Sequence, residues 1–264
     1  MTDLADTPAA SSPADPSNLS PRDEARVALA IDLCNLSSRA MQSVPVDPEA
    51  SPGALLRAAL DLQRLLNNVV VSAVIAERER GTTWDQIGMA ASMTRQSAHE
   101  KWTSDVKTWA ELGRTARSSN SSYATTLEYA TLADRQYAAT DPSRPQAVTS
   151  GLDAVRFPGS QAYEDNLRTR GAALHAQLRK LRATVKDVDE RHTALEEGGR
   201  DNDGLLSENL LKHAAAYDEM ADIYEQLVAA EPALADEHRS EAEYRRSVAQ
   251  KDRNYVELLQ ERQR

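Results

Sequence analysis

The spacing of apolar residues in the second half of the chain limits its fold more than any other feature. From Leu167 to Leu195, and again from Leu206 to Leu227, the mostly apolar positions recur at alternating intervals of four and three residues, which is the pattern of a coiled-coil seam. The polar stretch EEGGRDNDG between the two runs must break the helix, and so short a connection favours antiparallel neighbours. Residues 161–264 are therefore predicted to form a long antiparallel helical hairpin or coiled-coil region.

A third helix is expected after Glu231 and Pro232, but it has few apolar residues to pack with. A helix with so sparse an apolar face either docks weakly or needs a partner chain. We therefore expect the C-terminal helices to make the chain a homodimer or to dock a protein partner. The apolar set of this third helix is Leu234, Val248, Val256 and Leu259, with Tyr244 and Tyr255.

The composition of the chain favours one fold class and excludes several kinds of protein. Its 264 residues contain only 10 Gly, 11 Pro and 5% aromatic residues, so we expect an all-α fold with little or no sheet. A formal charge of -10 argues against coating nucleic acid or anionic membrane with the whole surface. The five histidines lack metal-site spacing, and glycine-rich phosphate loops and nucleophile motifs are absent. We therefore expect no enzyme activity, no metal and no cofactor.

Residues 1–140 are expected to consist of a tail followed by a helical domain. Residues 1–19 are rich in Pro, Ser and Ala, which is typical of a disordered tail. Ser20 and Pro21 are start signals for a helix, in which the single cysteine, Cys34, is expected to be a small core residue. A second helix has a wide apolar face and is expected to be largely buried. Its stripe consists of Leu55, Ala59, Leu62, Leu66, Val69 and Ala73.

The remaining expectations concern domain boundaries and cellular location. Residues 141–160 have proline or glycine at both ends and no strong helical period, which predicts a linker between a domain at 20–140 and the helices at 161–264. No apolar run approaches the roughly 20 residues of a membrane-spanning helix, and the acidic N-terminus is unlike a signal peptide. We therefore expect a cytoplasmic protein with no membrane partner.

Residues 82–102, TTWDQIGMAASMTRQSAHEKW, predict a helix-turn-helix at 83–102. Two helices that cross steeply need a tiny residue at the crossing point, and Gly88 is placed for that role. Trp84 and Ile87 would face the core from the first helix, and Ala98 and Trp102 from the second.

The second helix of this motif would present polar side chains to solvent at its amino-terminal end. Arg and Gln can each form paired hydrogen bonds with a base edge in the major groove, to guanine and adenine respectively. The residues expected to read bases are Arg95, Gln96, His99 and Glu100, and those expected to contact phosphates are Thr94, Ser97 and Lys101.

The sequences W-D-Q-I-G and T-R-Q-S-A in this stretch resemble the helix-turn-helix segments of actinobacterial regulators and of the promoter-reading region of sigma factors. The resemblance implies double-stranded DNA as a partner. Ser92 stands where such motifs usually have a glycine in the left-handed conformation, and Lys101 occupies a position that is often apolar. The large excess of Arg over Lys is also typical of an actinobacterial or actinophage coding bias.

The distribution of charge agrees with a local DNA contact. Residues 75–119 contain seven Arg or Lys against six Asp or Glu, whereas residues 161–264 contain 16 against 22. The sequence therefore predicts a sequence-specific DNA-binding protein, a transcriptional regulator that reads the major groove as a dimer. The alternative is a structural or adaptor protein of phage or plasmid origin, whose acidic helices bind a protein partner and whose helix-turn-helix only orients or recruits. The motif on its own could also be only a packed three-helix core with an ordinary solvated face.

Overall fold

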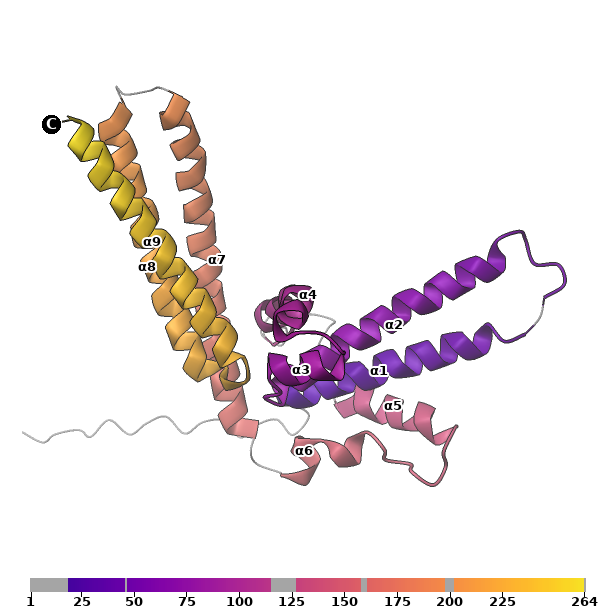
Figure 1. Ribbon diagram of the computed structural model, residues 1–264. Coiled ribbons are helices and arrows are strands. Elements are labelled where there is room, and N and C mark those ends of the chain that lie inside the picture. Colours follow the sequence, from indigo (N-terminus) through magenta and orange to yellow (C-terminus); the bar gives the residue numbers. More distant parts are fainter. Residues whose placement is uncertain (1–18, 46, 115–126, 158–160, 198–201, 264) are drawn as a thin grey trace, which may run out of the picture. The chain divides into compact units, whose positions relative to one another are not determined.

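The structure is a computed structural model, and it describes residues 19–45, 47–114, 127–157, 161–197 and 202–263. These residues are almost entirely helical and contain no strand (Figure 1), which confirms the all-α class. The expected tail lies outside the described residues except for Leu19. The main helices are α1 (Pro21–Gln42), α2 (Ala54–Glu79), α3 (Trp84–Ala90), α4 (Arg95–Thr108), α5 (Leu127–Ala138), α6 (Asp153–Arg156), α7 (Gln161–Glu197), α8 (Asp203–Ala230) and α9 (Ala235–Gln263).

The chain divides into two compact units, and each is discontinuous in sequence. The first unit contains Met1–Ala73 and Thr125–Asn166, and the second contains Val74–Ala124 and Leu167–Arg264. This division differs from the expected domain at 20–140, because the helix-turn-helix belongs with the C-terminal helices. The physical reason is a set of buried ion pairs between the two segments, described below.

The first unit has a small apolar core and two buried carboxylates that bind backbone amides. Asp23 accepts hydrogen bonds from the backbone N–H groups of Asp153 at 3.0 Å and Ala154 at 2.8 Å. Asp134 accepts one from the backbone N–H of Val148 at 2.6 Å. The linker expected at 141–160 is therefore wrong for its described residues, which pack into this unit. The core consists of Leu19, Val27, Ala130 and Leu152.

The start of α1 follows the expected signals, but its later turns do not pack as expected. The Ser20 hydroxyl accepts a hydrogen bond from the backbone N–H of Asp23, with Pro21 in the first turn. Cys34 is only half-buried rather than a core residue. Burial nonetheless raises the pKa of its thiol, which keeps the thiol protonated and unreactive at neutral pH.

The largest departure from expectation is α2, whose apolar face is not buried. In the part of this helix that belongs to the first unit, only Val69 is buried, and Leu55 leaves 83% of its surface exposed. α2 is also long and apolar enough to cross a membrane by length and composition, so the expectation that no segment meets this test is wrong. The expectation that α2 is largely buried is therefore wrong for this part of the helix, where the described residues of the first unit cover the stripe only in part.

The second unit contains a bundle of α7, α8 and α9 (Figure 1). Leu174 and Leu178 of α7 share one core with Met220 and Leu227 of α8, and Ala242 of α9 completes it. Near the other end of the bundle, a second core contains Leu206, Leu210, Val256 and Leu259, with Leu195 packed against it.

α9 packs within the chain more extensively than its sparse apolar set suggested. Small residues allow the close approach of two helices, because they remove the side-chain bulk between the backbones. Ala214 and Ala221 of α8 and Ala242 and Ala249 of α9 are all buried, with at most 4% of their surface exposed. Counting only large apolar residues therefore underestimated how well α9 docks onto α8.

Candidate nucleic-acid interface

α3 begins with a capping arrangement that fixes the entry of the chain into the motif. The Thr83 side chain accepts a hydrogen bond from the backbone N–H of Gln86, and the Gln86 side chain accepts one from the backbone N–H of Thr83 at 2.9 Å. This reciprocal pair satisfies two amides that a helix start leaves without partners. Trp84, Ile87 and Gly88 are then buried on the inner face of α3, as expected.

The turn between α3 and α4 has the geometry that a steep helix crossing requires. A Cβ atom on Gly88 would lie 2.9 Å from the carbonyl oxygen of Met93 and 3.1 Å from the carbonyl carbon of Thr94. Only glycine fits such an approach to the backbone without a shift. Ser92 has a φ of 56°, the left-handed conformation expected at this position of the motif.

α4 buries one face and begins at a side-chain cap. The Thr94 hydroxyl accepts a hydrogen bond from the backbone N–H of Ser97 at 3.1 Å, which satisfies an amide of the first turn. Ala98, Trp102 and Val106 are buried at intervals of four residues. The opposite face of the helix is solvated along its whole length.

Five of the seven predicted contact residues make side-chain contacts along α4 itself. Thr94 and Ser97 cap α4, and their hydroxyl groups lie 2.9 Å apart. Lys101 lies over the ring of Trp102, 4.8 Å from its centroid. The side-chain amide of Gln96 donates to the carboxylate of Glu100 at 2.9 Å. All these residues except the buried Trp102 remain exposed.

Arg95, Gln96 and His99 line a cleft whose far wall is acidic. The cleft has a volume of about 350 Å³, and its opposite wall is Asp236, Glu237 and Ser240 in the first turns of α9. The arginine and glutamine are exposed, whereas His99 is half-buried and contacts the ring of Trp84 edge-on, with 5.4 Å between centroids. Three of the four predicted base-reading side chains therefore meet at one site, which they share with carboxylates.

One buried carboxylate on α9 connects α9 to the ends of α2 and α3. Glu237 accepts hydrogen bonds from Nε of Arg78 at 2.8 Å and from the indole Nε1 of Trp84 at 2.8 Å. All three residues are buried. A second, partly exposed contact joins Lys107 of α4 to Glu241, one helical turn along α9. The position of α4 relative to α9 is thus set by polar bonds on two adjacent turns.

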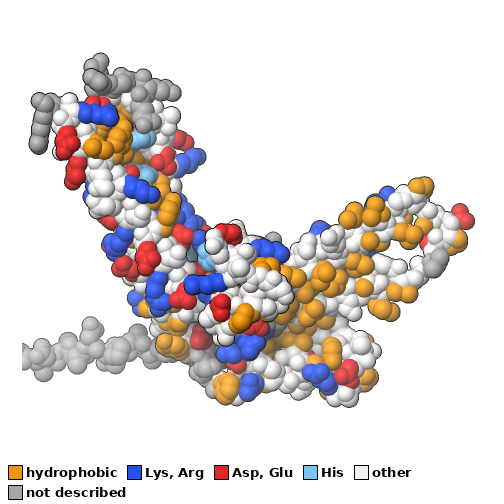
Figure 2. All heavy atoms as spheres, in the orientation of Figure 1, with side chains coloured by type: hydrophobic (Ala, Val, Ile, Leu, Met, Phe, Trp, Pro, Cys, Tyr) orange, Lys and Arg blue, Asp and Glu red, His pale blue; other side chains and the backbone are white. Residues whose placement is uncertain are grey.

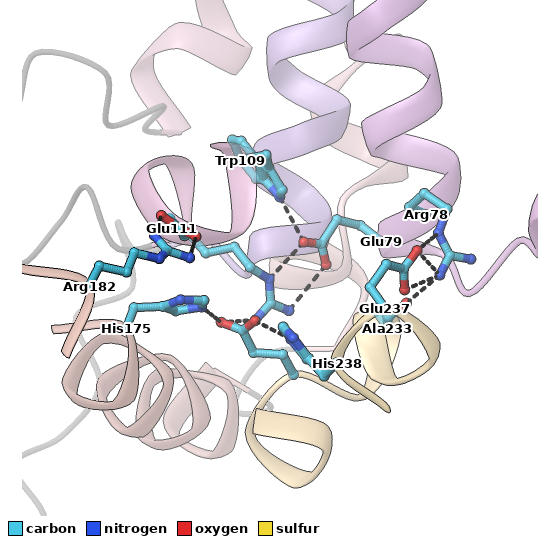
Figure 3. A network of polar contacts seen from close by, with 11 residues as sticks. Arg78, Glu79, Trp109, Glu111, His175, Arg182, Ala233, Glu237 and His238 are labelled. Carbon is cyan, nitrogen blue, oxygen red and sulfur yellow. Dashed lines mark hydrogen bonds and ion pairs between the residues drawn. The ribbon is translucent and has the colours of Figure 1, made fainter. Parts of the chain in front are cut away.

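A second buried carboxylate, Glu79, binds the segment that follows α4. It accepts hydrogen bonds from Trp109 Nε1 at 2.7 Å and from Arg114 Nε at 2.7 Å (Figure 3). Trp109 is the first residue of a π-helical turn at Trp109–Gly113, and Arg114 follows that turn. The turn begins where α4 ends. Nearby, Arg182 of α7 holds Glu111 by two hydrogen bonds of 2.8 and 2.7 Å. Burial raises the pKa of the Glu111 carboxyl, but these bonds and the charge of Arg182 outweigh that effect and lower it.

The centre of the network is Glu231, between α8 and α9. Its carboxylate lies 3.0 Å from His175 Nε2, 2.7 Å from His238 Nε2 and 3.5 Å from Arg114 Nη1 (Figure 3). Gly171 makes room for it, because a Cβ there would lie 2.8 Å from a Glu231 oxygen. Burial by itself raises the pKa of this carboxyl, but the two histidines and Arg114 outweigh burial, so the pKa lies well below its usual range.

Sequence reasoning found the motif but missed the network that holds it. The caps, the glycine and the inner residues of the motif depend on neighbours within about ten positions, whereas Glu237 lies 153 residues from Trp84. A signal of this network was present in the sequence, namely Gly171 within a seam of apolar residues. A glycine there indicates that another segment approaches closely, but it does not identify that segment. Within the described ranges, no group of three or more His, Cys, Asp or Glu side chains is placed to hold a metal ion.

Fold and site together define an all-helical protein in which a helix-turn-helix is docked on a three-helix bundle by buried ion pairs. Comparison of the chain with protein-family models, curated proteins and solved structures finds no match.

Proposed function

We propose that this protein binds double-stranded DNA through the amino-terminal end of α4 and distinguishes sequences in the major groove. The observation that carries the proposal is the α3–α4 crossing, with Gly88 at the close approach, Ser92 in the left-handed turn and Thr94 as the cap. This arrangement leaves Arg95 and Gln96 exposed on the first turn of α4, where the recognition helix of such a motif meets base edges.

The two side chains have the chemistry that base reading requires. The guanidinium of Arg95 has no hydrogen-bond partner among the described residues, so it can bind a base edge without first breaking an ion pair. Gln96 is held by Glu100 at 2.9 Å and would exchange that bond for one to a base. We infer a role in transcription regulation, in which two copies read two half-sites.

Loss of both reading side chains is the direct test of this proposal. The double variant Arg95→Ala/Gln96→Ala is expected to lower affinity for the preferred site by about 30-fold or more and to relax base preference, since two paired contacts are lost and each discriminates by roughly 1–3 kcal/mol. The measurement is selection from a random duplex library, followed by titration of the selected site with each protein.

The chain contains a matched control for this variant. Arg135 and Gln136 form the same pair of residues on the exposed side of α5, in the first unit. Arg135→Ala/Gln136→Ala makes the same change in charge and size, and we expect it to leave affinity and base preference unchanged. If the wild-type protein selects no sequence from the library, or if both double variants behave alike, the proposal is wrong.

The acidic wall of the cleft predicts a gain in DNA affinity on removal of a charge. Asp236 faces the same cleft as Arg95, so a duplex that contacts this arginine brings its phosphates toward a carboxylate. Asp236→Asn is expected to raise affinity roughly two- to fivefold at low salt, and the gain should shrink as salt screens the charge.

Asp222→Asn is the control for that variant. Both aspartates are exposed and paired with an arginine, Asp236 with Arg239 at 2.7 Å and Asp222 with Arg246 at 2.8 Å, but Asp222 does not line the cleft. Equal effects of the two substitutions on DNA affinity would show that only net charge matters and that α4 does not bind DNA beside this wall.

A role as an adaptor is the second candidate, and the same wall favours it. A cleft lined by one arginine and two carboxylates, of which Asp236 is exposed, suits a mixed-charge protein surface as well as it suits a base edge. An adaptor would bind DNA without sequence preference or not at all. The library selection therefore separates the two functions in a single experiment.

A further inference from the structure

The exposed apolar face of α2 is the largest feature of the first unit that its own packing does not use. Figure 2 shows hydrophobic side chains gathered along the pair of helices α1 and α2. Five large apolar residues of α2 are exposed, with 38% to 83% of their surface accessible. We call this set the α2 face, and it consists of Leu55, Leu56, Leu60, Leu66 and Val70.

The spacing of this helix is that of a seam between two helices. The stripe from Leu55 to Ala73 alternates steps of four and three residues, which places its members in one line along a helix that pairs with another. Val69 is buried and Leu62 is half-buried, but Leu55, Ala59 and Leu66 are exposed. The line is therefore only partly filled by the chain itself.

α1 is joined to α2 by polar contacts on another side of the helix. Ser72 donates to Asp32 at 2.5 Å, and Arg39 donates to Asp61 at 3.1 Å. Leu33 and Met41 of α1 are themselves exposed, by 47% and 68%. α1 thus leaves the α2 face open and adds apolar surface of its own.

We propose that a second copy of this chain packs on the α2 face, so that the protein is a dimer through its N-terminal helices. The exposed side chains of the face together present an apolar patch of several hundred Å², which soluble monomers rarely expose. Each partner in a stable dimer contributes about 800 Å², so the α2 face supplies a large part of such an interface, to which the exposed residues of α1 can add.

Charge supports a second copy as the occupant. The chain as a whole has a formal charge of -10, so two copies repel each other over most of their surface. The charged residues of α2 before its last turn are Arg57, Asp61 and Arg64, and helical spacing places all three away from Leu55 and Leu66. The α2 face is therefore uncharged around Leu55 and Leu66 and is bordered at Leu60 by Arg57 and Arg64. Two acidic chains can meet on it without acidic side chains in contact.

The polar residues in the middle of α2 disfavour a lipid bilayer as the occupant of the α2 face. α2 is apolar and long enough to span a membrane, but Arg64, Asn67 and Asn68 are exposed near its middle. A charge at the centre of a bilayer costs about 3 kcal/mol even on the most lenient scale. With only two arginines before its last turn, α2 also lacks the rows of basic residues that hold a helix on an anionic membrane surface.

This dimer differs from the one expected through the C-terminal helices, and Val256 and Leu259 of α9 are already used in a core inside the chain. It does not rest on DNA binding, and it can be correct or wrong independently of the proposed function. If both hold, the α2 face is what supplies two copies of α4 to one DNA site.

The test is the mass of the full-length protein in solution, measured by sedimentation over a wide concentration range. We expect the wild-type chain to be a dimer and Leu55→Glu/Leu66→Glu to be a monomer, with a dissociation constant raised by about 100-fold or more. Both side chains are half-exposed or more, so the monomer should keep its helical circular dichroism. The control is Leu205→Glu/Leu258→Glu, which alters similarly exposed leucines of α8 and α9 and should stay dimeric.

Hydrogen exchange on the wild-type protein tests the interface without any substitution. Dimerisation through the α2 face predicts that amides of residues 54–70 become better protected as protein concentration rises, while those of α8 and α9 do not change. A monomeric wild-type chain, protection confined to α8 and α9, equal masses for both leucine variants, or co-sedimentation of monomers with lipid vesicles would each overturn the proposal.

Discussion

Replacing Glu231 with alanine is expected to lower the free energy of unfolding of the second unit by about 3–5 kcal/mol, the cost of removing one partner from a buried ionic cluster. The Glu231 side chain is 1% exposed and faces His175, His238 and Arg114. Without the carboxylate, the buried His175 and His238 lose this hydrogen-bond partner, and Arg114 keeps its bonds to Glu79 but loses its second carboxylate. The measurement is denaturant unfolding followed by circular dichroism, with hydrogen exchange to assign the loss to the second unit.

Two further variants separate charge from packing at this position. Glu231→Gln keeps the volume and some hydrogen bonds, so it should destabilise less than alanine but still measurably. Glu225→Ala removes a carboxylate of the same helix that is exposed and paired with Arg246, and it should change stability by less than about 0.5 kcal/mol. Equal losses for Glu231→Ala and Glu225→Ala would mean that the buried network contributes no more than a surface pair.

The lowered pKa of Glu231 also predicts how stability depends on pH. A carboxyl with a pKa lower in the folded protein than in the unfolded chain stabilises the fold above its unfolded pKa of about 4.3. That contribution is lost as pH falls below this value toward the lower folded pKa. The wild-type protein should therefore lose stability below about pH 4 more steeply than Glu231→Gln, and parallel acid profiles would contradict the shift.

The helix-turn-helix could be predicted because its determinants are local. Gly88 and Thr94 lie within seven residues of each other, and each suits a requirement of the turn's own backbone, a close approach and a helix cap. Ser92 adopts the left-handed conformation at the position where such motifs usually have glycine. The helix starts at Ser20 and Thr83 were readable for the same reason. Local rules of this kind do not depend on which distant segment packs against the motif.

The docking of the motif could not be predicted, because polar network residues have no periodic signature. Glu237 and Glu241 look in the sequence like members of a solvated helix face, and only the fold shows that Glu237 is buried. The error for α2 was the reverse, because this helix was expected to be buried and is largely exposed. Its apolar stripe predicts packing, but a sequence does not distinguish a partner within the chain from one outside it.

The loss of the Trp84 indole is expected to destabilise the helix-turn-helix by about 3–5 kcal/mol when it is replaced by alanine. The side chain is 4% exposed, and three groups contact it: Glu237 through Nε1, Arg78 with its guanidinium 5.2 Å from the ring centroid, and His99 at the ring edge. Alanine leaves a cavity and also removes one of the donors to a buried carboxylate.

Trp84→Phe separates these two contributions, because it keeps most of the packing and removes only the indole N–H. We expect it to cost about 1.5–3 kcal/mol, the usual range for a hydrogen bond to a charged group. Met89→Ala is the control, since that side chain belongs to the same helix but is 67% exposed.

Hydrogen exchange tests whether Trp84 also stabilises α9, because a role confined to the helix-turn-helix would leave the protection of α9 amides unchanged. Since Trp84 binds the first turn of α9 through Glu237, Trp84→Ala should lower the protection of amides in α3, in α4 and at the start of α9 together. Trp84→Phe should affect the start of α9 more than it affects the core of α3. If α9 exchanges as in the wild-type protein in both variants, the indole stabilises only its own motif, and the link to the bundle depends on the ion pairs of Arg78, Lys107 and Arg114.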